Sequence, residues 1–274
     1  MKINIKENKW HALLIGLVII QFIPLVFMLS TSFKSMDAIF SNPLDIIPDN
    51  ITFDNYKYIL ENVEIGKYLM NTFFIATAVT VGKLILSVLA AYVFVYKDFK
   101  GKNIVYTILI LTIFIPFTVI MIPNYLTMSE LGLLNSPLGV ILPQFADAMG
   151  IFLIRQHMRT IPKSLIEVGK LEDMKDFNIL RRIVFPLVKN SAMSMGIIFF
   201  INSWNEYFWP MLILTDKGDY TLSLALQMFI SAEGGNEWGV AMALAALTIL
   251  VPIILYIICQ KFIISTFMNS GVKG

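Results

Sequence analysis

A few polar side chains lie inside stretches that are otherwise too apolar for water, and these are the residues at which chemistry could occur. Lys83 stands near the middle of one stretch, and Gln144 and Asp147 stand in another. Ionisable residues inside membrane-spanning segments are rare and mark ion or substrate pathways. An unpaired lysine at that depth costs at least about 2.5 kcal/mol. We therefore expect Lys83 to approach a carboxylate, either Asp147 or Glu206.

A second polar group lies in a later apolar stretch. Asn202, Asn205, Glu206 and Trp209 fall at positions i, i+3, i+4 and i+7, which places them on one face of a continuous helix. These side chains either line a pathway for a polar substrate or brace one helix against another by hydrogen bonds. The sequence leaves both interpretations open.

The composition indicates that these residues are in a membrane. The 274 residues are 57% hydrophobic and 15% charged, which is more apolar than an ordinary soluble domain. The net charge of +2 is too small to indicate nucleic-acid binding. No metal site, phosphate-binding loop or grouped acid, base and nucleophile is visible, so we expect this chain to bind no cofactor of its own, and a membrane enzyme is disfavoured.

These residues must be positioned by membrane-spanning helices. A bilayer core of roughly 30 Å requires about 20 mostly apolar residues per helix. The sequence predicts an all-α membrane protein with Pro-induced kinks at Pro116, Pro123 and Pro143. The six predicted spans cover about residues 12–29, 69–95, 104–123, 138–154, 192–214 and 240–259.

The distribution of positive charge predicts how these spans are oriented. If the N-terminus is inside, 16 of the 21 Lys and Arg residues fall in cytoplasmic segments. The positive-inside rule then places both termini in the cytoplasm. The segment 155–190, which contains eight of these cations, lies on the same side.

Local signals predict a helix-turn-helix in the segment 155–190. Ser164 and Glu167 have the spacing of a capping box, which predicts a helix start there and a helix that runs to about Leu171. We expect a second helix from Asp176 to Phe185. A solvated basic linker is the alternative, but it has no reason to contain capped amphipathic helices.

The turn between these helices falls at Glu172, Asp173 and Met174, and Pro186 is expected to end the second helix. The whole segment resembles the EAA loop of ABC importer permeases. The matching residues are Ile161-Pro162-Lys163-Ser164-Leu165, Glu167-Val168-Gly169, Glu172-Asp173-Met174 and Ile183-Val184-Phe185-Pro186-Leu187.

The resemblance implies that this loop is a coupling element that docks on a cytoplasmic ATPase. It assigns ATPase coupling to Ser164, Glu167, Val168, Gly169, Glu172, Asp173, Met174 and Pro186. Two residues depart from the family pattern, because Asp173 replaces its glycine and Gly169 its second alanine. Asp is among the few residues that tolerate the left-handed turn a glycine would make.

The segment Trp204-Asn205-Glu206-Tyr207-Phe208-Trp209-Pro210 extends the resemblance to the carbohydrate-uptake branch, specifically the smaller maltose-transporter-type permease. This resemblance implies the type I ABC importer permease fold and a place in a bacterial cytoplasmic membrane. It also implies four kinds of partner: a second homologous permease, two ABC ATPase subunits holding ATP and Mg, an extracytoplasmic solute-binding protein, and a sugar or oligosaccharide.

Further alternatives remain at the level of the sequence. The aromatic rings around Trp209 either stack on a sugar or lie in the aromatic belt at the membrane interface. The C-terminal residues Gly271, Val272, Lys273 and Gly274 either contact the ATPase or form a frayed chain end. A secondary transporter or channel would use Lys83 and its acid as an ion relay.

Overall fold

The computed structural model describes residues 5–48, 50–230 and 237–271, and it divides into two compact units. Unit 1 comprises residues 1–66 and 225–251, and unit 2 comprises residues 67–224 and 252–274. The described residues form helices and turns and contain no strand, which confirms the predicted fold class.

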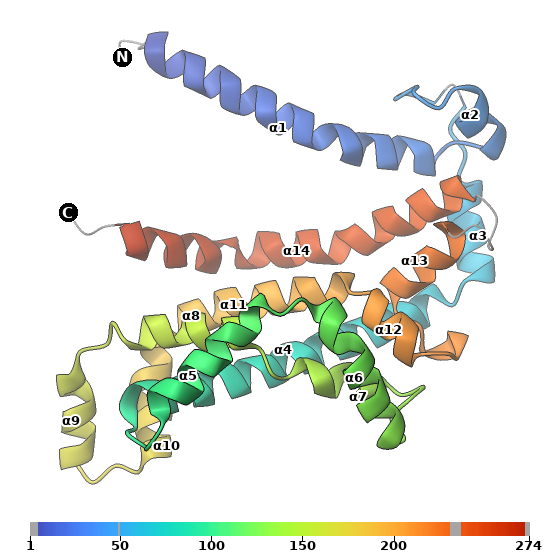
Figure 1. The fold of residues 1–274 in the computed structure, drawn as a ribbon. Helices are drawn as coiled ribbons and strands as arrows, with labels where there is room; N and C mark the ends of the chain where they lie inside the picture. The colour runs from blue at the N-terminus through green and yellow to red at the C-terminus, as the bar shows by residue number, and fades with distance from the viewer. Residues whose placement is uncertain (1–4, 49, 231–236, 272–274) are drawn as a thin grey trace. The chain divides into compact units, whose positions relative to one another are not determined.

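Fourteen α-helices follow one another along the described chain (Figure 1). They are α1 (Ile5–Ser32), α2 (Met36–Ser41), α3 (Asp54–Asn62), α4 (Ile65–Tyr96), α5 (Lys102–Leu111), α6 (Phe117–Glu130), α7 (Pro137–Ile141), α8 (Ala148–Met158), α9 (Lys163–Leu171), α10 (Asp176–Ile179), α11 (Phe185–Asn205), α12 (Phe208–Ile213), α13 (Leu222–Ile230) and α14 (Trp238–Gly271). Short 3-10 turns at Thr112–Phe114, Leu142–Gln144 and Lys217–Asp219, and a π-helical turn at Leu180–Val184, complete the sequence of elements.

Four of the described helical stretches are long and apolar enough to cross a membrane: Trp10–Ser32, Ile65–Tyr96, Asp176–Asn205 and Trp238–Gln260. Two further crossings are bent pairs, α5 with α6 and α7 with α8. Counting each pair as one crossing gives the six that the sequence predicts.

The third predicted span is not a single kinked helix. It breaks between Phe114 and Phe117, where its two halves meet at 105°. Pro116 explains the break, because a proline disfavours helical backbone at the preceding residue. Ile115 is accordingly extended, with φ −83° and ψ 115°.

The fourth and fifth predicted spans are also interrupted. In the fourth, the helix axis turns by 44° before α8, and the extended residue there is Asp147 rather than a neighbour of Pro143. In the fifth, α11 ends at Asn205, and extended backbone at Glu206 precedes α12. The predicted face from Asn202 to Trp209 is therefore divided between two elements, and Gln144 and Asp147 also belong to separate elements.

Unit 1 contains α1, α2, α3 and the first part of α14. Its connection from α1 to α3 is held by side-chain hydrogen bonds: Asn55 Nδ2 donates to the carbonyls of Ser32 and Lys34 at 2.9 Å each. Lys34 is 2% exposed, and its Nζ donates to the carbonyls of Asn42 and Asp45. The short helix α2 lies within this connection, between Lys34 and Asn42.

Unit 2 has two apolar clusters at different levels along α4. Ile75 and Val79 belong to a cluster with residues of α6, α7 and α12. Val88 and Ala91 belong to a cluster with residues of α8, α9, α10 and α11. Lys83 lies between these two levels of α4, so the predicted site separates the clusters.

The helix-turn-helix that the sequence predicts is present as α9, a turn and α10, at the opposite end of unit 2 from α12 (Figure 1). The prediction of a capping box is wrong. The helix α9 begins at Lys163 after the N-cap residue Pro162, and no side chain makes a capping hydrogen bond there. Ser164 is thus already inside the first turn, where its hydroxyl cannot cap the helix.

The end of α9 agrees with the prediction. The helix stops at Leu171, and Asp173 adopts the left-handed conformation with φ 53°. The Asp173 N–H donates to Lys170 O at 3.1 Å, and the Met174 N–H donates to Gly169 O at 3.0 Å. These two hydrogen bonds form a Schellman motif, in which glycine is the usual left-handed residue.

Asp173 therefore gives a test of local backbone strain. Asp173→Gly is expected to stabilise the chain by about 1 kcal/mol, because it removes the left-handed penalty of a side chain. Asp173→Val is expected to destabilise it by about 1–3 kcal/mol, because β-branched residues are disfavoured there. Thermal unfolding of the detergent-purified variants measures both changes, and equal midpoints would contradict this view of the turn.

The second predicted helix does not end at Pro186. Instead α10 passes through the π-helical turn Leu180–Val184 into α11, and Pro186 lies in the first turn of α11. The Phe185 N–H donates to Leu180 O, five residues back. This wider turn gives room to a proline ring that would clash with the preceding turn of a regular helix. As a result, α10 and α11 form one continuous helical stretch.

Candidate functional site

The centre of the candidate site is an ion pair between two membrane-spanning elements. Lys83 Nζ on α4 lies 3.2 Å from Asp147 Oδ2, and the two side chains are 16% and 21% exposed. Lys83 also faces the ring of Phe199, with 5.3 Å between Nζ and the ring centroid. The predicted pairing of Lys83 with an acid is confirmed, and the acid is Asp147.

Asp147 serves a second purpose at the break before α8. Its Oδ1 accepts a hydrogen bond from the Gly150 N–H at 2.7 Å, so the carboxylate is the N-cap of α8. A negative charge is favoured at this position by the unpaired N–H groups of a helix N-terminus. One carboxylate therefore neutralises Lys83 and completes the helix that resumes after the break.

Two glycines allow these elements to approach. A Cβ atom at Gly82 would lie 2.3 Å from the ring of Phe145. A Cβ atom at Gly150 would lie 2.5 Å from the ring of Phe199 and 2.7 Å from Ser87 Oγ. Any side chain at either position would separate the helices. The sequence signal was available, because Gly82 precedes Lys83 and Gly150 follows Asp147 by three residues.

A cavity of about 250 Å³ lies beside the ion pair. Its lining combines most of the polar residues predicted for the pathway with two polar residues that sequence reasoning missed, Asn124 and Ser203. The other lining residues are apolar: Phe117, Ile120, Pro143 and Ala146. The predicted residues in the lining are Lys83, Gln144, Asp147, Asn202, Glu206 and Trp209. Asn205 is exposed and is not part of this lining, because α11 ends there.

Two polar atoms in this lining have no hydrogen-bond partner within the described chain. They are Ser203 Oγ and Trp209 Nε1, both buried. Buried donors without a partner are costly. A water molecule or a hydroxyl group of a ligand in the cavity would satisfy them.

Glu206 has a structural position at the second helix break. Its Oε1 accepts hydrogen bonds from the Phe208 N–H at 2.9 Å and the Trp209 N–H at 3.2 Å, so it caps α12. The expected single face from Asn202 to Trp209 is thus wrong, since Trp209 belongs to α12. The two interpretations of the aromatic residues, stacking on a sugar or lying in the interfacial belt, both require exposed rings. Trp204 and Trp209 are buried, whereas Tyr207 is exposed.

The predicted coupling helix α9 has three distinct faces. Ile166 and Gly169 face the protein, and a Cβ atom at Gly169 would lie 2.9 Å from Ile183 Cδ1. The glycine that departs from the family pattern thus allows α9 to pack closely on the π-helical turn. Met174 also packs against this cluster.

The other two faces of α9 are open. Lys163, Glu167 and Lys170 line a second cavity, described below. Leu165, Val168 and Leu171 project outward with 41%, 52% and 85% of their surface exposed. Ser164, Glu172 and Asp173 are exposed as well, so most of the residues assigned to ATPase coupling are accessible.

Together, the broken apolar helices, the polar cavity between them and the exposed amphipathic helix define a membrane transport protein. A family model for the inner membrane component of binding-protein-dependent transport systems matches residues 83–267. The chain belongs to this family, whose members are permease subunits of ABC importers.

Similar proteins support the assignment over nearly the whole chain. The arabinooligosaccharides transport system permease protein AraQ of Halalkalibacterium halodurans is 30% identical, with 96% of each chain covered. The sn-glycerol-3-phosphate transport system permease protein UgpE is 31% identical in Yersinia pestis and 29% identical in Rhizobium meliloti, with 94% of each chain covered.

Solved structures give the same result for the fold. A chain of a bacterial ABC transporter involved in the import of the acidic polysaccharide alginate is 25% identical, with a TM-score of 0.81 over 95% of this chain and 99% of that chain. A chain from a bacterial alginate ABC transporter, in complex with a periplasmic protein bound to alginate pentasaccharide, has a TM-score of 0.69 at 14% identity. The type I ABC importer permease fold that the resemblance implied is confirmed.

Proposed function

We propose that this chain forms half of the translocation pathway of an ATP-driven importer for a sugar or oligosaccharide. A second homologous permease forms the other half, and an extracytoplasmic solute-binding protein delivers the substrate. Two ABC ATPase subunits bind ATP and Mg and hydrolyse the nucleotide. Both termini and the α9–α10 loop face the cytoplasm, in agreement with the distribution of Lys and Arg.

The observation that supports this proposal most is the division of α9 into a packed and an exposed apolar face. A short exposed helix gains nothing from Leu165, Val168 and Leu171 in water, whereas the same residues would provide the apolar centre of an interface. The packed face joins the cluster that contains Val184 and Val188 of the α10–α11 stretch. Movement of a docked α9 would therefore be passed directly to α11.

The polar cavity provides the substrate part of the proposal. It lies beside the ends of α8, α11 and α12, where interrupted helices leave backbone and side-chain polar groups available inside the membrane. Glu206 and Asp147 also brace these ends, so the bracing and pathway interpretations apply to the same residues. The cavity offers Asn202, Ser203 and Gln144 as uncharged partners for substrate hydroxyl groups.

The C-terminal contact with the ATPase remains a proposal from the family resemblance. Val272, Lys273 and Gly274 lie outside the described residues, and the structure describes only the backbone of Gly271, at the end of α14. The alternative of an ion-coupled secondary transporter is disfavoured by the family assignment. The ion pair it required is present, but it also caps α8 and so has a structural reason to exist.

Copurification and uptake test this function together. The tagged chain, expressed with its neighbouring transport genes, is expected to copurify with an ATPase and a second permease. Membrane vesicles containing this complex and the binding protein are expected to accumulate a labelled oligosaccharide only with hydrolysable ATP. Uptake that persists with a non-hydrolysable ATP analogue and follows an ion gradient would overturn the importer in favour of the secondary transporter.

A further inference from the structure

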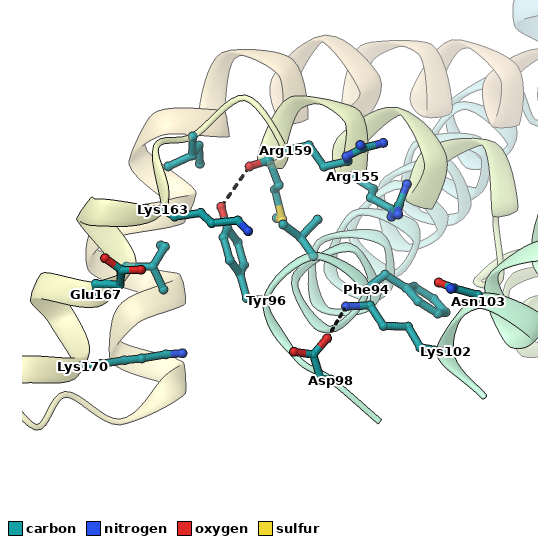
Figure 2. Close-up of a pocket in the computed structure, with 14 residues that line it drawn as sticks. Phe94, Tyr96, Asp98, Lys102, Asn103, Arg155, Arg159, Lys163, Glu167 and Lys170 are labelled. Atoms are coloured by element: carbon teal, nitrogen blue, oxygen red, sulfur yellow. Dashed lines mark hydrogen bonds and ion pairs between the residues drawn. The ribbon is translucent and has the colours of Figure 1, made fainter. Parts of the chain in front are cut away.

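A second cavity lies between α9 and the ends of α4, α5 and α8, with a volume of about 580 Å³ (Figure 2). Its lining is strongly basic. The five cations are Lys102, Arg155, Arg159, Lys163 and Lys170, and the two carboxylates are Asp98 and Glu167. In Figure 2, Lys163 and Lys170 extend from α9 toward the side on which Tyr96 and Asp98 lie.

Most of this positive charge is not neutralised by the protein. Lys102 pairs with Asp98 at 3.2 Å and also donates to the carbonyl of Lys97. Within the described residues, no carboxylate lies at ion-pair distance from Arg155, Arg159, Lys163 or Lys170. Four cations in one cavity repel each other unless an anion enters.

Arg155, one of these four cations, is held by an aromatic contact. Its guanidinium carbon lies 3.9 Å from the centroid of the Tyr106 ring, so the side chain stacks on α5. Its Nε is buried and has no hydrogen-bond partner among the described residues. A guanidinium held in this way can present its remaining N–H groups as a planar fork, which matches the oxygens of a phosphate.

The surroundings of the cavity indicate where such a phosphate would come from. One wall is apolar, formed by Phe94, Met158, Ile161 and Ile166. The cavity lies at the ends of the membrane helices α4, α5 and α8. A basic cavity with an apolar wall at the ends of membrane helices suits an anionic headgroup with its acyl chains beside that wall.

We propose that this cavity binds the phosphate of an anionic membrane lipid, whose acyl chains begin at the apolar wall of the cavity. The phosphate bridges Arg155 of α8 and Arg159, which directly follows α8, with Lys163 and Lys170 on α9. A bound lipid therefore fixes α9 against the end of α8, while Leu165, Val168 and Leu171 stay free on the opposite face. The binding does not depend on the proposed transport function, since it requires only the folded chain in a membrane.

The test uses the purified full chain and three probes: phosphatidylglycerol, phosphatidylcholine and inorganic phosphate. Phosphatidylglycerol is expected to raise the thermal unfolding midpoint and to remain bound in native mass spectra, whereas phosphatidylcholine does neither. R155Q/R159Q is expected to weaken phosphatidylglycerol binding at least tenfold. The matched control, K175Q/R182Q, removes two exposed cations outside the cavity and is expected to bind like the native chain.

A second variant controls for the possibility that the loss of Arg155 impairs folding. K163Q/K170Q changes only exposed side chains of α9 and is also expected to weaken binding. Unchanged binding in both variants, or an equal loss in the control, would overturn the lipid site. Displacement of phosphatidylglycerol by millimolar inorganic phosphate would assign the cavity to a soluble phosphate and would likewise overturn the lipid proposal.

Discussion

Asp147→Ala is expected to reduce uptake to less than a tenth and to destabilise unit 2 by at least about 3 kcal/mol. The substitution leaves Lys83 without its partner at 3.2 Å and removes the cap on the Gly150 N–H. Removing one member of a largely buried ion pair is costly because the other charge stays buried. Uptake into vesicles and thermal unfolding of the purified chain measure the two losses separately.

Two further variants separate the cap from the charge. Asp147→Asn keeps an oxygen that can accept from the Gly150 N–H, so it should lose only the ion pair and be more stable than Asp147→Ala. K83M/D147N removes both charges. It should be more stable than Asp147→Ala or Asp147→Asn, because neither of those removes the buried charge of Lys83. An Asp147→Ala chain that is as stable and as active in uptake as the native chain would show that the ion pair is not part of the functional site.

Leu171→Asp is expected to abolish ATP-dependent uptake while the chain remains folded and inserted. Leu171 is 85% exposed and lies outside the apolar cluster beneath α9, so a carboxylate costs little in the free chain. In an apolar interface the same carboxylate would cost at least about 2 kcal/mol, or roughly thirtyfold in affinity. Copurification of the ATPase and its stimulated hydrolysis measure this loss.

Leu44→Asp is the matched control for this experiment. Leu44 is also 85% exposed, but it belongs to the segment between α2 and α3, which lies on the outer side in the proposed orientation. Normal uptake in Leu44→Asp and lost uptake in Leu171→Asp would locate coupling at α9. A folded Leu171→Asp chain that still retains its ATPase would place the docking surface elsewhere.

The sequence predicted those features in which a single physical cost dominates. The membrane environment makes an isolated charge at Lys83 expensive, so a nearby acid was expected, and Asp147 provides it. Asp173 belongs to the few residue types that tolerate a left-handed turn, and it forms one. In both cases the residue type alone restricts the structure strongly.

Other features depend on packing that the sequence does not display. The proline at position 116 predicted a kink, but the 105° angle of the break depends on how the two halves pack. Pro186 was expected to stop a helix, whereas the π-helical turn before it allows the helix to continue. Ser164 and Glu167 have capping-box spacing, yet the N-cap of α9 is Pro162, two residues before Ser164.

The bent helix pairs also have a consequence for biogenesis. The 11 residues of α8 extend roughly 17 Å, about half of a hydrocarbon core, and the 10 residues of α5 extend roughly 15 Å. Neither helix can cross the membrane alone, and the exposed backbone at each break must be covered by protein. Stable insertion of these segments should therefore wait until α11, synthesised later, packs against α8. If the chain is truncated before residue 185, we expect its middle segments to remain bound to membrane insertases or to be degraded by proteases.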